Sequence, residues 1–185
     1  MVERGIIKEE EQELYQFGIR NGMILLLNVV TALVIGLLTE QLAVVAVFTL
    51  SFMVLRSYTG GYHSDSRIFC YLGSNLVLLV PVYTQAVFYK TSLACLLAVL
   101  LVSAGIIFLL SPMHSKNRKL DKEEQKHFGR KARLIAALEL AVLGILWHAG
   151  QIPYAYAVYT GICITALFML VGKAQLWIQS HTENG

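Results

Sequence analysis

The sequence predicts an all-α integral membrane protein with about six transmembrane helices, and three observations lead to this fold class. Apolar residues make up 56 % of the 185 residues and charged residues only 15 %, whereas a soluble domain carries about a quarter; the mean hydropathy is +0.61. The apolar residues form blocks that approach the ~20 residues needed to cross a hydrocarbon core. Basic residues gather almost entirely on one predicted side. Continuous apolar runs favour spanning helices over the alternating strands of a barrel.

The predicted spans follow the apolar blocks, which run over 22–38, 41–55, 68–88, 91–110, 132–149 and 153–171. The first two are short. Only Thr39, Glu40 and Gln41 separate them, so they form a tight hairpin, and the sequence leaves open whether one is partly re-entrant. Pro81 lies inside the third block and predicts a kink, with the lost backbone bonds satisfied by neighbouring helices.

The topology follows from the 15 lysine and arginine residues. With the N-terminus inside, all of them except Lys90 fall in inner segments. This asymmetry fits the positive-inside rule with both termini cytoplasmic, and removing one span would scramble it. The first twenty residues hold five glutamates, which does not suit a cleavable signal peptide. The whole chain, 1–185, is therefore expected to form a single membrane domain.

Three segments lie outside the predicted spans. Residues 1–20 place Ile7, Leu14 and Phe17 on one helical face, which favours an amphipathic interfacial helix over the alternative of a frayed polar tail. Residues 111–131 form a basic cytoplasmic loop, in which Asp121 and Glu124 resemble a capping box that starts a short helix. Its basic residues suit anionic headgroups, an acidic peptide or a plain topogenic role. Residues 172–185 form a cytoplasmic tail.

The segment between the second and third spans, RSYTGGYHSDSRIFC (56–70), carries the candidate chemistry. A cysteine attacks as the thiolate, which a nearby base, a cation or a helix N-terminus favours. Cys70 lies at the start of the third span, where the helix dipole favours the thiolate. Arg67 precedes it by one turn, and Arg56 approaches from the end of the second span. His63 can accept the proton and return it to the leaving amine.

The spacing also constrains the geometry of this pair. Two residues seven apart in one helix are separated by ~10.5 Å, too far for a hydrogen bond. His63 must therefore fold back from a loop, which Gly60 and Gly61 permit. The plain alternatives are a buried cysteine and a solvated histidine. Cys95 and Cys163 are expected to be small buried hydrophobes. No metal site is predicted, because no further ligands stand at zinc-like spacing.

The residues Arg56, Gly60, Gly61, His63 and Cys70 resemble the signature of the accessory gene regulator B (AgrB) family, membrane peptidases of bacterial peptide quorum sensing. The family often follows its histidine with alanine, whereas this chain has Ser64. A second similarity lies in SPMHSKNRKLDKEEQKHFGRK (111–131), which looks like the family's cytoplasmic loop. The resemblance covers nearly the whole chain.

The resemblance implies that Cys70 is the nucleophile and His63 the general base and acid, with Arg56 and Gly61 in support. Gly60 and Arg67 are further supporting candidates from their positions in the segment. It implies an AgrD-like precursor peptide as substrate, cleaved before its acidic tail through a thioester and cyclised to a lactone or thiolactone. No cofactor and no nucleic acid partner is implied. The expected location is the cell membrane, with the site at the cytoplasmic face and a homodimer as the assembly.

Several residues are weaker candidates. Asp65 or Ser74 would orient His63 or the substrate, against the plainer roles of a solvated acid and a packing hydroxyl. Lys116, Arg118 and Lys119 would bind the acidic tail of the substrate. Glu139, an intramembrane acid, would pair with a loop arginine or contact substrate. The alternative function is a small transporter or a scaffold protein without chemistry, which would be indifferent to Cys70→Ala.

Overall fold

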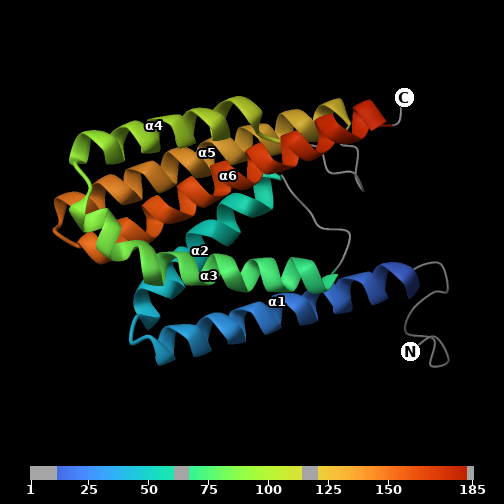
Figure 1. Ribbon diagram of the computed structural model, residues 1–185. Helices are drawn as coiled ribbons and strands as arrows, with labels where there is room; N and C mark the ends of the chain where they lie inside the picture. Colours follow the sequence, from blue (N-terminus) through green and yellow to red (C-terminus); the bar gives the residue numbers. More distant parts are fainter. Residues whose placement is uncertain (1–11, 61–66, 114–120, 183–185) are drawn as a thin grey trace.

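The computed structural model describes residues 12–60, 67–113 and 121–182, and all regular structure within them is helical (Figure 1). The helices are α1 (Gln12–Leu38), α2 (Leu42–Thr59), α3 (Arg67–Lys90), α4 (Leu93–Leu110), α5 (Lys122–His148) and α6 (Ile152–Thr182). The all-helical prediction is confirmed for these residues.

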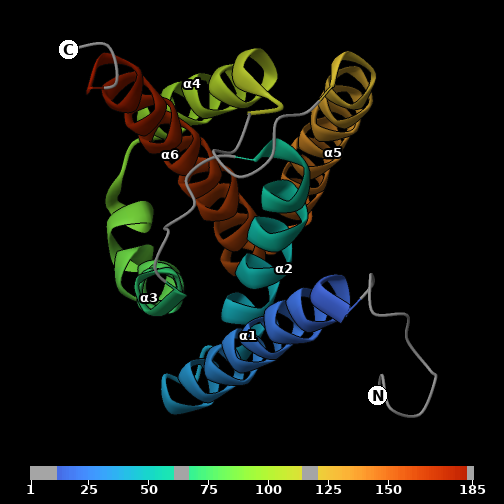
Figure 2. The same cartoon turned by 90° about the vertical axis from the view of Figure 1, so that its right-hand side faces the viewer.

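Helices α2 and α6 form the centre of the bundle. Figure 2 shows α4 and α5 beside this central pair on one side and α1 and α3 on the other. Two apolar clusters hold the layers together. One gathers around Phe48 of α2 and Tyr156 of α6, and the other around Leu55 of α2 and Met169 of α6. The helix that ends just before the His63 segment therefore belongs to the central pair of the fold.

Short turns close one end of the bundle. At residues 149–151, Gly150 has a φ of +72°, and the N–H of Gln151 donates to the carbonyl oxygen of Leu146 at 2.9 Å, which is the bonding of a glycine-terminated helix. Glu40 plays the corresponding part after α1 with a φ of 57°. The tight hairpin expected at 39–41 is confirmed. We call this end, with the turn 91–92, the Gly150 end.

The opposite end of the bundle is where α2 and α4 end and α3 and α5 begin, and we call it the Gly60 end. Proline within α3 changes the course of that helix, whose later part turns toward α4 in Figures 1 and 2. The hydroxyl of Tyr156 in α6 donates to the carbonyl oxygen of Pro81 at 2.9 Å. A side chain of a neighbouring helix thus bonds the backbone at the proline, although the carbonyl that the proline leaves without its helical donor is that of Val77.

Four helices of the described chain are long and apolar enough to cross a membrane: α2, the Tyr71–Lys90 part of α3, α4 and the Ile152–Ile178 part of α6. The apolar stretch of α1, Gly22–Leu38, is shorter. Helix α5 joins a charged first half to an apolar second half. The structure thus supports a membrane protein, while six spans and the orientation of the termini stay predictions.

Three predicted boundaries differ from the structure. Helix α1 runs unbroken from Gln12 to Leu38, so the described part of the expected interfacial segment 1–20 continues into the first apolar block. Likewise, the charged helix after Asp121 and the fifth block are one helix, and α6 extends into the expected tail as far as Thr182. Helix propagation is cooperative, so a change from apolar to polar residues does not by itself end a helix.

Candidate active site

The structure describes only part of the predicted site. Cys70 lies in the first turn of α3, which begins at Arg67. Arg56 lies in the last turn of α2, and Gly60 follows that helix directly. Other predicted residues lie outside the described residues: Gly61, His63, Asp65, Lys116, Arg118 and Lys119. The pairing of His63 with Cys70 therefore stays a prediction.

Arg56 joins the end of α2 to α6. Its Nη1 donates to the carbonyl oxygen of Gly60, which closes the C-terminal end of α2. Its guanidinium carbon lies 5.5 Å from the ring centroid of Phe168, within the range of a cation–π contact. The charge of an arginine is also favourable at a helix C-terminus. Arg56 thus fixes the point at which the chain leaves α2 toward the His63 segment.

Gly60 is required at this exit by both its conformation and its surroundings. Its φ is +72°, and a Cβ built on it would lie 2.5 Å from the carbonyl oxygen of Met113. The N–H of Met113 donates to the carbonyl oxygen of Thr59 at 2.9 Å, and Thr59 is fully buried. An L residue here would meet left-handed strain and a backbone clash together.

The same contact brings two predicted functional segments to one place. The His63 segment follows Gly60, and the basic loop with Lys116 follows Met113. Helix α5 packs closely here as well, since a Cβ on Gly129 would lie 2.9 Å from Cδ of Pro112. Tyr58 and Phe128 have ring centroids 6.4 Å apart. Both segments therefore leave the bundle from one packed corner of the Gly60 end.

A polar seam runs between α1 and the first turns of α3. The hydroxyls of Thr31 and Tyr71 lie 3.0 Å apart in a hydrogen bond. The side-chain oxygens of Asn28 and Asn75 are buried and, among the described residues, have no hydrogen-bond partner. Ser74, predicted as a weak candidate, is half-buried on α3 in the same region. The seam places α1 directly beside the helix that carries Cys70.

Glu139 is bonded within the bundle. The Oγ of Ser51 in α2 donates to its Oε2 at 2.6 Å. A Cβ on Gly161 of α6 would lie 2.5 Å from Ser51 Oγ, so glycine lets three helices meet at this bond. Among the described side chains, Glu139 thus accepts from a hydroxyl. Its expected pairing with a loop arginine or with substrate stays a prediction.

The two other cysteines lie away from this corner. Cys163 is partly buried in α6, whereas Cys95 is exposed on α4. The expectation that Cys95 is buried was wrong, because its side chain borders an open apolar cavity between α3, α4 and α6. Within residues 12–60, 67–113 and 121–182, no group of three or more His, Cys, Asp or Glu side chains forms a metal site.

Sequence reasoning missed several residues that shape the site. Phe168, Ser51 and Gly161 carry no motif, and, like Met113, they lie far along the chain from their partners. A small residue in an apolar block, such as Gly161, is the one weak signal of close helix packing. The partner across the packing surface is set by the tertiary fold.

Comparison with known proteins gives a consistent result. The accessory gene regulator B family matches residues 1–170, which include the whole 56–70 segment. The accessory gene regulator protein B of Staphylococcus intermedius is 26 % identical over 156 residues, covering 82 % of this chain and 80 % of the relative.

Two proteins of Clostridium perfringens are also similar. They are an AgrB-like protein 2 of strain 13 and an AgrB-like protein of strain SM101, each 24 % identical over 131 residues. The match covers 68 % of this chain and only 61 % of each relative's length. No solved structure matches. Since the family match extends over most of the sequence, the chain belongs to the accessory gene regulator B family.

Proposed function

We propose that the protein is a membrane cysteine endopeptidase that processes the precursor of a quorum-sensing peptide. One observation carries the proposal: the family match spans residues 1–170 and so includes His63 and Cys70 at the spacing of the family signature. The start of α3 supports it. A cysteine in the first turn of a helix has its thiolate favoured by the positive end of the helix dipole.

The first chemical step is attack by Cys70 Sγ on a peptide carbonyl carbon at the end of the signal segment of the precursor. His63 takes the thiol proton and delivers it to the leaving amine as the C–N bond breaks. The acidic tail departs with a new N-terminus. The rest of the precursor stays on the enzyme as a thioester at Cys70.

The second step is acyl transfer within the precursor. Its internal thiol attacks the thioester carbon and expels the Cys70 thiolate, which closes a thiolactone ring; an internal hydroxyl would give a lactone. Exchange of one thioester for another needs no added energy source, provided that water is kept from the acyl group. A site beside the apolar blocks of the chain suits that exclusion.

The basic loop is the proposed binding place for the acidic tail, through Lys116, Arg118 and Lys119 at the cytoplasmic face. The contact between Gly60 and Met113 supports this, because it starts the basic loop next to the chain that leads to His63. Attraction between exposed charges weakens with salt. Binding of the tail should therefore fall as the salt concentration rises.

The test uses the full chain in lipid vesicles with a synthetic precursor that has an internal thiol and an acidic tail. We expect Cys70→Ala to abolish cleavage while the precursor still binds. His63→Ala should slow cleavage, and it should also slow the alkylation of Cys70 at pH values below ~8.5, the reference pKa of cysteine. Cys95→Ala and Cys163→Ala are matched controls that keep activity. Mass spectrometry of the stalled wild type should show the thioester.

Cleavage by Cys70→Ala at the wild-type rate would reject the peptidase. If Cys70 is alkylated as slowly as Cys163, whatever the residue at position 63, the activated pair is also rejected. Either result would favour the transporter or scaffold.

A further inference from the structure

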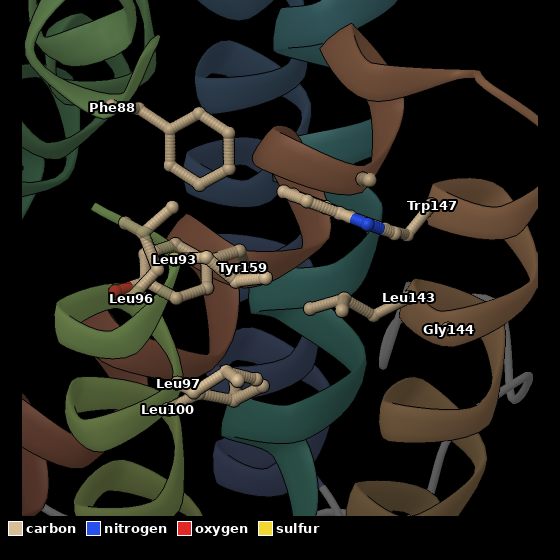
Figure 3. Close-up of a pocket in the computed structure, with 10 residues that line it drawn as sticks. Phe88, Leu93, Leu96, Leu97, Leu100, Leu143, Gly144, Trp147 and Tyr159 are labelled. Atoms are coloured by element: carbon tan, nitrogen blue, oxygen red, sulfur yellow. The ribbon is translucent and has the colours of Figure 1, made fainter. Parts of the chain in front are cut away.

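An apolar cavity of about 270 Å³ lies near the Gly150 end, among α3, α4, α5 and α6. Figure 3 shows the rings of Phe88, Trp147 and Tyr159 around it, with Leu97 and Leu143 from facing helices. Most of its wall is aliphatic or aromatic. The cavity is separate from the corner at Gly60, so an inference from it does not rest on the proposed function.

The space in the cavity borders on Gly144. A Cβ built on this residue would meet no atom within 4 Å, apart from its own helix backbone. Protein interiors rarely keep such voids, because unfilled space forfeits dispersion contacts. Apolar cavities also exclude water and accept apolar ligands. The occupant that this cavity fits is therefore a hydrocarbon group.

The cavity reaches the exposed surface of the protein at α4. Leu93 and Leu97 line the cavity and are 53 % and 48 % exposed, and Trp147 is 38 % exposed. A second apolar cavity of about 300 Å³ shares Phe88, Leu96 and Tyr159 with the first.

The chemistry around the mouth matches a headgroup. Lys90 ends α3, two residues after Phe88 and three before Leu93, and its side chain is exposed. Tyr89 and Trp147 are exposed at the same end, as in the aromatic belts at membrane interfaces. A cation at this level attracts lipid phosphate. Apolar walls below an interfacial cation are complementary to an anionic phospholipid.

We propose that this cavity binds one acyl chain of an anionic phospholipid, with the phosphate beside Lys90. The test uses the full chain with Trp177→Phe, which leaves Trp147 as its sole tryptophan. It is placed in phosphatidylcholine vesicles that contain increasing phosphatidylglycerol with brominated acyl chains. Bromine quenches tryptophan fluorescence on contact. We expect quenching that saturates at a low fraction of brominated lipid.

Two variants and one control define the site. Gly144→Leu fills the cavity and should remove the saturable quenching. Gly105→Leu is the matched control, because Gly105 also has open space around it but does not line the cavity; it should keep the quenching. Lys90→Gln should abolish the preference for phosphatidylglycerol over brominated phosphatidylcholine.

Two results would overturn the proposal. In the first, quenching of the parent rises linearly with the fraction of brominated lipid, and Gly144→Leu leaves it unchanged. In the second, Gly144→Leu melts at a higher temperature than the parent and keeps its quenching. The latter would mean an empty cavity. If Gly144→Leu does not fold, a photoreactive phospholipid on the parent chain decides. Labelling that concentrates on Leu93–Leu100 and Leu143–Trp147 supports the site, and labelling spread evenly over exposed α1 overturns it.

Discussion

The two ends of the bundle are built differently, although each contains a glycine with a φ of +72°. At the Gly60 end, the missing side chain is replaced by a carbonyl oxygen of another segment, 2.5 Å from where a Cβ would stand. At the Gly150 end, a Cβ would meet nothing within 4 Å. A glycine with the same φ is held by tertiary contacts in one place and only by local bonding in the other.

This difference indicates that the position of the backbone matters more at the Gly60 end than at the Gly150 end. The chain that leaves α2 at Gly60 leads to the proposed catalytic histidine, and a misplacement of 1 Å can cost about 100-fold in rate. Contacts from Arg56, Met113 and Gly129 hold this exit in place. Near the Gly150 end, the helices instead separate around apolar space, which tolerates change.

The largest expected difference is between the two glycines. Gly60→Ala adds a clash with the Met113 carbonyl to the strain of a backbone conformation (φ 72°, ψ −154°) that is essentially restricted to glycine. Gly150→Ala adds only the strain of a positive φ, about 1–2 kcal/mol. We expect Gly60→Ala to lose processing of the precursor nearly completely, and Gly150→Ala to keep it with a modest loss of thermal stability. Processing in vesicles and melting in detergent measure the two effects.

This pair can also break the comparison. If Gly150→Ala reduces processing as much as Gly60→Ala does, then backbone strain anywhere in the bundle disables the protein. The packed exit from α2 would then have no special role.

A smaller effect is expected from the aromatic residues at the two ends. Phe168→Leu keeps an apolar side chain but removes the ring beneath Arg56, a contact of about 0.5–2 kcal/mol. We expect a partial loss of processing, which Phe168→Tyr avoids because it keeps the ring. Phe88→Leu, in the aromatic cluster with Trp147 and Tyr156, should leave processing unchanged. The turnover of precursor by each variant at saturating concentration is the measurement.

The outcomes separate a positioning role from simple packing. Equal losses in Phe168→Leu and Phe168→Tyr would show that the volume of Phe168 matters and its contact with Arg56 does not. A shift in the pH dependence of Cys70 alkylation in Phe168→Leu alone would support the positioning role.

Much of the fold was predictable because local chemistry decides it. The apolar blocks predicted the helices, the short connection from Thr39 to Gln41 predicted the hairpin, and Asp121 with Glu124 predicted the cap of α5. The predicted boundaries of α1 and α6 were wrong, because a polar residue does not by itself end a helix whose hydrogen bonds are already formed. The exposure of Cys95 was missed because the pattern in a fully apolar helix does not say which face meets lipid.

The site divides in the same way. The sequence predicts the motif residues Arg56, Gly60 and Cys70 from spacing and resemblance, and their catalytic roles stay predictions. The tertiary contacts around the motif were not predictable from the sequence. The bond of Ser51 to Glu139 spans 88 positions, and the packing of Arg56 on Phe168 joins α2 to α6. Such pairs are set by the way helices pack, which one sequence alone does not specify.

The smallest expected effect comes from the helix caps at the two ends. Asp121 accepts from the N–H of Glu124 at 2.7 Å in a capping box, and Ser92 accepts from the N–H of Cys95 at 3.4 Å. Loss of a cap typically costs about 1 kcal/mol, and the shorter bond to a charged acceptor is the stronger. Asp121→Ala should therefore lower the melting temperature more than Ser92→Ala. Because α5 starts within the basic segment 111–131, just after Lys116, Arg118 and Lys119, Asp121→Ala should also weaken precursor binding, while Asp121→Ser, which keeps a cap, restores it. A binding loss in Ser92→Ala of the same size would mean that the start of α5 has no particular part in holding the substrate.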